Sequence, residues 1–267
     1  MLAAPLQKGS LDDFPRPDML AESEYVVVDV ETNGFEPSEG AEVLEVAALR
    51  FREGQPVATF ASLVRPTRPV HPSASAVNSL TTEMLLAAPD AEHVMGLLDS
   101  FIGAHELVVA HNARFDRKFL PVLKAREWCC SYRFARHIWK EAPDFKNQTL
   151  RYWLKLDSRA LRGVSAHRAS DDCLVTGLLF QRELLAYQGI HPYATLDDVV
   201  AFVNSPLTVS RFMFGRKYYA ANLEAIPTEY LEWVVGDAQK PEEFRWLRCD
   251  RETMIAVRSE MGKRVSL

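Results

Sequence analysis

The sequence predicts an α/β fold in which a mixed central sheet is flanked by helices, followed by a small C-terminal α/β or α module. Strand-like segments come first in the chain, and strands then alternate with helices, which is the order typical of layered α/β proteins. The 267 residues are 48% hydrophobic and 25% charged, the proportions of a globular protein. This composition excludes a disordered or collagen-like chain.

Shifts in composition predict how the chain is organised. Residues 1–22 contain several prolines and no clear period, so we expect a disordered leader there. The main domain is expected over residues 23–190. A Gly-Ile-His-Pro break leads into residues 191–204, where we expect a connecting helix, and residues 205–267 form the small module with aromatic residues of its own.

Three strands are expected near the start of the main domain. Residues 25–30 (YVVVDV) are a short β-branched apolar run, typical of a buried central strand, and residues 31–34 (ETNG) predict a turn. Residues 43–51 and 57–64 are strand-like segments on either side of Glu53-Gly54-Gln55. They predict a hairpin, so the sheet is expected to be mixed.

Helical spacing begins after a proline-rich loop, and one more strand interrupts it. The fourth strand is expected over residues 107–110 (LVVA). Asp90 and Asn112 are suited to cap the helices that follow them. The expected helices span residues 81–87, 90–102, 114–126, 132–140, 148–156 and 171–188.

Two carboxylates stand at the end of the first expected strand. Side chains alternate between the two faces of a strand, so Asp29 and Glu31 are expected on the same face of the sheet. Two like charges in a low-dielectric setting raise each other's pKa unless a cation neutralises them, and a divalent metal ion would do so. The same acids would be harmless on a strand that emerges into solvent. The pair alone leaves both possibilities open.

Further polar residues occupy positions where ligands gather in α/β proteins. Asp116 follows the fourth strand, in the first turn of the next helix, where the helix dipole alone also favours an acid. If the first and fourth strands are parallel neighbours, Asp116 lies at the same sheet edge as the first pair of acids. His167 precedes the last helix of the main domain, whose first turn carries Asp171 and Asp172. Periodicity does not distinguish these two aspartates.

Three segments taken together resemble a known family. VVVDVETNG (residues 26–34), AHNARFD (residues 110–116) and HRASDD (residues 167–172) are similar, in order and spacing, to the three motifs of the DEDDh exonucleases. That family has an RNase H-like fold and includes the proofreading epsilon subunit of bacterial DNA polymerase III, RNase T and oligoribonuclease. Its third motif, H-x-A-x-x-D, implies Asp172 rather than Asp171 and pairs it with His167.

The resemblance implies the chemistry of the site. Asp29, Glu31, Asp116 and Asp172 would hold two Mg²⁺ or Mn²⁺ ions, hard cations that prefer oxygen ligands. In such sites one ion activates a water molecule and the other stabilises the leaving oxygen. His167 would be the general base, since histidine ordinarily titrates near ~6.5. The implied reaction is stepwise hydrolysis of DNA from the 3′ end with release of 5′-mononucleotides.

The implied partner is single-stranded or duplex DNA with a 3′ end, in repair or trimming. RNA trimming of the RNase T or oligoribonuclease type is an alternative, because contacts to the ribose 2′-OH, rather than the metal site, decide between DNA and RNA. A second alternative is a non-catalytic nucleic-acid-binding module that has kept the fold. The five intact motif residues argue against it.

Four more residues are candidates for substrate contacts. Thr32 and Asn33 follow the first motif and are equally suited to forming the turn alone. Asn112 lies in the second motif, where it is also suited to cap a helix. Family members often carry a histidine where Asn78 stands. Outside the motifs the resemblance extends to residues 63–77, 128–139 and 208–216, although the last of these departs from the family's F-G-K pattern at Phe214-Gly215-Arg216.

Charge is unevenly distributed along the chain. The 31 Lys and Arg against 36 Asp and Glu give a net charge of −5, and an acidic total by itself disfavours a nucleic-acid partner. Residues 114–162, however, hold 13 basic and 5 acidic residues, a local balance of +8. This stretch joins the second and third motifs. We therefore expect it to line the approach to the metals and to make substrate binding depend on salt.

The cysteines and the apolar segments bear on the cellular compartment. The four cysteines include no C-x-x-C pair, which argues against a zinc site and a disulfide framework. The N-terminus has no apolar signal segment, and no stretch reaches the ~18–20 apolar residues that a membrane span needs. We expect a cytoplasmic protein that has no membrane partner.

Overall fold

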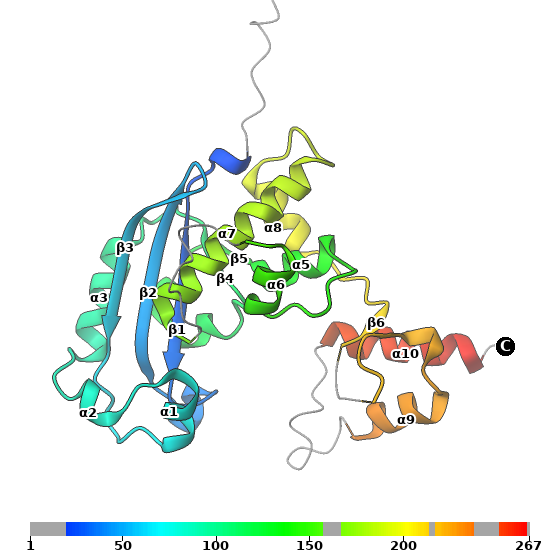
Figure 1. Ribbon diagram of the computed structural model, residues 1–267, viewed down its shortest axis with the longest axis horizontal. Coiled ribbons are helices and arrows are strands. Elements are labelled where there is room, and N and C mark those ends of the chain that lie inside the picture. Colours follow the sequence, from blue (N-terminus) through cyan, green and yellow to red (C-terminus); the bar gives the residue numbers. More distant parts are fainter. Residues whose placement is uncertain (1–19, 157–166, 214–216, 238–250, 266–267) are drawn as a thin grey trace, which may run out of the picture.

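The computed structural model describes residues 20–156, 167–213, 217–237 and 251–265. They form a five-stranded sheet between layers of helices, with a smaller C-terminal part beside it (Figure 1). The strands are β1 (Tyr25–Thr32), β2 (Val43–Arg52), β3 (Gln55–Leu63), β4 (Val108–Ala110) and β5 (Trp128–Cys130), in the order β3-β2-β1-β4-β5. β1 is antiparallel to β2 and parallel to β4, so the predicted mixed sheet is confirmed.

The helices that precede the C-terminal part follow the predicted order, except that α1 was not predicted, and they differ from the prediction at their ends. They are α1 (Pro72–Asn78), α2 (Thr82–Leu85), α3 (Ala91–Phe101), α4 (Asp116–Phe119), α5 (Ser131–Ile138), α6 (Asn147–Trp153), α7 (Ala169–Gln188) and α8 (Leu196–Asn204). The predicted cap of α3 is confirmed, because the Asp90 side chain accepts a hydrogen bond from the backbone N–H of His93 at 3.0 Å.

The alternation along β1 divides its side chains between two cores. Tyr25 and Val27 belong to the core beneath α7 and α8, whereas Val26, Val28 and Val30 belong to the core beneath α3. Figure 1 shows α3 and α7 on opposite sides of the sheet. Odd-numbered positions of β1 therefore face α7, and this is the face that carries the two acids at the end of the strand.

A glycine lets α7 lie close to the sheet. A Cβ atom added to Gly177 would stand 2.0 Å from the ring of Phe51, so only glycine fits this contact. The Tyr25 hydroxyl donates a hydrogen bond to the Gly177 carbonyl at 3.2 Å, and the Tyr25 ring stacks on Phe51 with centroids 5.4 Å apart. These contacts fix the helix over β1 and β2.

The prediction of one helix over residues 114–126 was wrong. The segment folds as α4, one turn long, followed by the short 3₁₀ helix Pro121–Leu123. Pro121 has no N–H to donate and its ring clashes with the preceding turn, so the helix cannot pass through it. Asn112 does not cap α4 either: its φ of 70° is left-handed, and Phe115 is the residue that precedes the helix.

Two elements were missing from the prediction. α1 begins at Pro72, which pre-sets φ for a first helical position, and the His71 side chain accepts a hydrogen bond from the N–H of Ser73. The prolines around it had indicated a loop. β5 is only three residues long, and its pairing with β4 defines it more than any pattern in its own sequence.

The described C-terminal residues have a small core of their own. Phe212, Leu231 and Val257 are buried together in it. Its elements are β6 (Arg211–Phe212), β7 (Ala221–Asn222), the 3₁₀ helix Leu223–Ala225, α9 (Thr228–Asp237) and α10 (Arg251–Val265). The domain boundaries stay a prediction. Phe214-Gly215-Arg216 and most of the expected leader lie outside the described residues, while Leu20 is buried in the main core.

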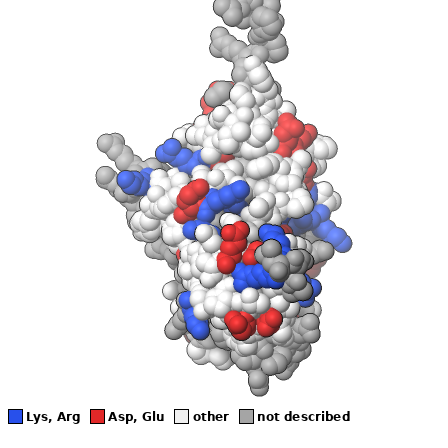
Figure 2. Space-filling model, turned by 90° about the vertical axis from the view of Figure 1, so that its right-hand side faces the viewer, with Lys and Arg blue, Asp and Glu red and all other residues white. Residues whose placement is uncertain are grey.

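The surface and the helices bear on the charge and membrane predictions. Figure 2 shows basic and acidic side chains side by side on the face that it presents, so the net charge of −5 is not reflected there as a uniformly acidic surface. Within the described residues, no helix combines the length and the apolar character that a bilayer crossing requires.

Candidate active site

The first two acids lie where β1 leaves the sheet. Asp29 and Glu31 share the face of β1 that α7 covers, as their spacing predicts, and both side chains are half-buried. Burial raises the pKa of Asp29 well above its ordinary value, and repulsion by Asp116, Asp172 and Glu31 raises it further. Acids from three separate segments of the chain therefore converge on Asp29.

Asp116 completes the cluster from the neighbouring strand. It is the first residue of α4, directly after β4, and only 2% of it is exposed. Burial raises its pKa to about 7 despite hydrogen bonds from backbone N–H groups, and repulsion by Glu31 contributes to the rise. Because β1 and β4 are parallel neighbours, their carboxyl ends bring Asp116 to the predicted sheet edge.

The third segment enters from the N-terminus of α7. One carboxylate oxygen of Asp172 accepts a hydrogen bond from the backbone N–H of His167, and the other accepts one from the Gln148 side chain, both at 2.9 Å. Burial raises the pKa of Asp172. Of the two adjacent aspartates, Asp172 is therefore the one that belongs to the cluster.

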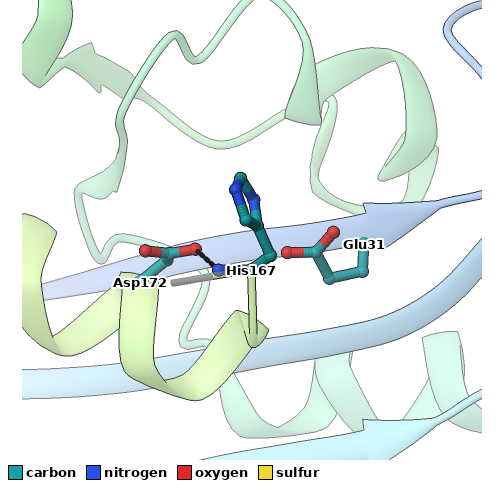
Figure 3. Close-up of side chains that lie close together, drawn as sticks. All are labelled: Glu31, His167 and Asp172. Atoms are coloured by element: carbon teal, nitrogen blue, oxygen red, sulfur yellow. Dashed lines mark hydrogen bonds between the residues drawn. The ribbon is translucent and has the colours of Figure 1, made fainter. Parts of the chain in front are cut away.

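Glu31, His167 and Asp172 form a group that could hold a metal ion. Figure 3 shows the imidazole of His167 between the two carboxylates, and one ligand atom from each residue lies within 4.8 Å of the others. Burial raises the pKa of Glu31 to about 7, and repulsion by Asp172 and Glu45 adds to the rise, so the site gains from a cation. Carboxylate oxygens are the donors that Mg²⁺ and Mn²⁺ prefer. The residues present fit a divalent metal.

An ion pair between the exposed Arg168 and the buried Glu45 holds the His167 loop against the sheet. Arg168 binds the carboxylate of Glu45 through two guanidinium nitrogens, the closest contact being 2.8 Å. Glu45 also accepts a hydrogen bond from the N–H of Ala169 at 3.2 Å, and it is 4% exposed on β2, opposite Glu31. His167 itself has a left-handed φ of 64°, which the flanking contacts maintain.

Three of the four predicted substrate contacts are engaged within the protein. The Thr32 hydroxyl donates to the Gly34 carbonyl, and the Asn33 side chain accepts from the N–H of Glu42, each at 2.6 Å. Asn78 is 2% exposed and donates to the Thr32 carbonyl at 3.2 Å. These side chains shape the turn after Glu31. Asn112, in contrast, is exposed and lines a cleft.

Sequence reasoning missed several residues around the cluster. Glu45 and Gln148 come from β2 and α6, and neither has a pattern that links it to the motifs. Arg168 lies inside the third motif, so the sequence shows its position, but it does not show that Glu45 is its partner. Phe35, four residues after Glu31, is 80% exposed, and an aromatic residue in a turn is the signal that could have drawn attention to it.

Comparison with protein families identifies the main domain. The profile described as "RNase_T: Exonuclease" matches residues 26–180, which include all five motif residues. Among curated proteins, the chain is 30% identical over 220 residues to Exodeoxyribonuclease 10 of Escherichia coli (strain K12), covering 81% of this chain and 93% of that protein. It is also 30% identical over 183 residues to DNA polymerase III PolC-type of Thermotoga maritima, where the match covers 66% of this chain but 13% of the polymerase.

Solved structures give the same result. Exonuclease X in complex with 5′ overhanging duplex DNA matches with a TM-score of 0.55 and 28% identity, over 67% of this chain and 99% of that one. Exonuclease I of E. coli in complex with a dA16 oligonucleotide matches with a TM-score of 0.51 and 16% identity, over 67% and 45% of the two chains, which is a likeness of fold alone. The predicted RNase H-like exonuclease fold and the predicted exonuclease family are confirmed.

Proposed function

The chain belongs to the RNase_T exonuclease family, and on that premise we propose that it hydrolyses DNA stepwise from the 3′ end and releases 5′-mononucleotides. The observation that carries the proposal is the convergence of four acids and a histidine at one sheet edge. Burial raises the pKa values of Asp29 and Asp116, so their ionised carboxylates would be costly without a cation. Proteins retain such clusters for function.

Divalent metal ions complete the proposed site. Asp29, Glu31, Asp116 and Asp172 would hold two Mg²⁺ or Mn²⁺ ions, and these supply activation of the attacking water and stabilisation of the leaving oxygen. The identity and number of the ions are part of the proposal.

The protein side chains then orient the reaction and move the proton. His167 is exposed at the rim of the cluster, which lets its imidazole reach a water molecule and accept its proton as general base. The hydrogen bond from its backbone to Asp172 and the ion pair between Arg168 and Glu45 hold it there. Neither contact uses a ring nitrogen of His167, which supports its proposed role as the base.

DNA is the proposed substrate because of the relatives. Exonuclease X has been solved with DNA, and the relative that the chain resembles along most of its length is named an exodeoxyribonuclease. In the site itself, no described contact distinguishes deoxyribose from ribose. The experiment that tests the proposal therefore includes RNA as a substrate.

The test compares end-labelled single-stranded DNA, duplex DNA and RNA of equal length, each with Mg²⁺, with Mn²⁺ and with EDTA. We expect metal-dependent release of 5′-mononucleotides from the 3′ end of DNA and inactivity in EDTA. Faster cleavage of RNA would replace the DNA proposal with RNA trimming. Inactivity on all three polymers would contradict the nuclease proposal and favour a non-catalytic nucleic-acid-binding module.

Gln148 is expected to act through Asp172. The Gln148→Met variant keeps the volume of the side chain but cannot donate to the Asp172 carboxylate, and losing such an outer partner of a ligand typically costs about 10–100-fold in metal affinity or activity. Titration of Mn²⁺ and the exonuclease rate measure the two effects. Thr149→Ala, the next residue on α6, is the control. A Gln148→Met protein that matches the parent in both measurements would contradict this role.

A further inference from the structure

A second site is lined in part by residues of the second motif. It is a cleft of about 530 Å³ lined by residues that include Arg114, Arg117, Arg133 and Arg136, and we call it the arginine cleft. Among the described residues, the only acid that lines it is Glu252, which is paired with Arg133. Four arginines and one glutamate leave the cleft with a net charge of +3.

The walls of the cleft are held in place. Arg133 donates to the backbone carbonyls of Val203 and Ser205, at 3.0 and 2.9 Å, and so ties the end of α8 to α5. Its contact with Glu252 brings in α10 of the C-terminal part. The guanidinium of Arg117 lies over the ring of Trp128, 5.7 Å from its centroid.

Arg114 and Arg117 are the members that can receive a ligand. Both are exposed, whereas Arg136 is 8% exposed and Arg133 is bound to the α8 backbone and Glu252. Guanidinium groups bind phosphate in a bidentate manner and are weakly hydrated, so a concave group of them favours an anionic ligand such as a phosphodiester over an apolar one. Asn112 adds an amide to the same cleft.

Sequence position links the cleft to the carboxylate cluster. Asp116 lies between Arg114 and Arg117, and it points to the metal-binding edge while the arginines line the cleft. The cleft therefore lies next to the carboxylate cluster along the chain.

We propose that the arginine cleft binds the phosphodiester backbone of the substrate strand upstream of its 3′ end, with Arg114 and Arg117 as the phosphate contacts. The inference rests on the proposed function, since the strand must enter the carboxylate cluster by its 3′ end. It explains why part of the basic stretch after the second motif lies beside α4 in an otherwise acidic protein. It also gives the C-terminal part a role as one wall of the strand's path.

The test uses the full chain with both arginines replaced, Arg114→Gln and Arg117→Gln. Two substrates are compared, a single-stranded oligonucleotide of about 20 nucleotides and the p-nitrophenyl ester of thymidine 5′-monophosphate, which is too short to reach the cleft. We expect the ratio of kcat/KM for the oligonucleotide to that for the ester to fall about tenfold at low salt. The slope of log affinity against log salt should become shallower by about 1.4, the value for two lost contacts to a single strand.

Arg182→Gln is the matched control, because this exposed arginine lies ten residues along α7 from Asp172, about 15 Å away along the helix. A ratio and a salt slope equal to those of the parent would overturn the cleft proposal, and so would an equal loss on both substrates. Should the double variant fail to fold, Arg114→Glu tests the same contact at an exposed position. Binding of the labelled oligonucleotide in EDTA reports on the cleft separately, so failure of the cleft and failure of the proposed nuclease activity give different results.

Discussion

Replacing Asp116 by asparagine is expected to remove nearly all nuclease activity and, in the absence of metal, to make the folded protein more stable at alkaline pH. Metal ligation contributes several kcal/mol to such reactions, and about 4 kcal/mol corresponds to roughly a thousandfold in rate. The amide of asparagine keeps the size of the side chain but brings no charge to the cation. The measurement is the rate of mononucleotide release at saturating Mg²⁺.

The gain in stability follows from the direction of the pKa shift. Burial raises the pKa of Asp116 from 3.8 to about 7, so the folded protein holds this proton at pH values where the unfolded chain has lost it. The free energy of unfolding of the metal-free protein therefore decreases as the pH rises from about 4 to about 7. At about 1.4 kcal/mol per pKa unit, the ionised Asp116 costs on the order of 4 kcal/mol.

Urea unfolding in EDTA at about pH 5 and about pH 8 tests this expectation. The parent should lose stability between the two values, and Asp116→Asn should lose less of it. Added Mg²⁺ should stabilise the parent at the higher pH by binding the folded state, and stabilise the variant far less. Asp171→Asn, which removes a neighbouring acid outside the cluster, is the control. An Asp116→Asn protein with the parent's activity or the parent's pH dependence would remove Asp116 from the proposed metal site.

The fold could be predicted where the pattern is local. The apolar run of β1 and the hairpin of β2 and β3 were visible because alternation and a two-residue turn are properties of neighbouring residues, and Glu53 and Gly54 both have the positive φ that this turn requires. β5 was not visible, since its three residues form a strand only by pairing with β4. The helix after β4 was overextended because helical spacing outweighed Pro121 in the prediction.

The acids of the site could be predicted from the sequence, but the residues that hold the site in place could not. Asp29 and Glu31 stand two apart on one strand, and Asp116 follows a parallel neighbour, so strand geometry alone brings them together. Choosing Asp172 over Asp171 needed the family pattern. Glu45 lies 123 positions from Arg168, and no local rule pairs residues at that distance.

His167 offers the second large effect, because its position allows two roles. As general base it would accept the proton of the attacking water, and its removal would lower kcat by about 10²–10⁴. Its ring is, however, also close enough to the carboxylates of Glu31 and Asp172 to serve as a metal ligand. Exonuclease activity of His167→Ala falls under either role, so activity alone does not separate them.

Metal affinity separates the two roles. If His167 is the base, Mn²⁺ titration of His167→Ala should give an affinity within a few-fold of the parent, because the four carboxylates remain, while kcat falls by the full amount. If it is a ligand, affinity falls with activity, and excess Mn²⁺ restores part of the rate. His105→Gln, an exposed histidine before β4, is the control. We expect the first result, since the backbone N–H of His167 already binds Asp172 and leaves the imidazole at the exposed rim, where the water must arrive.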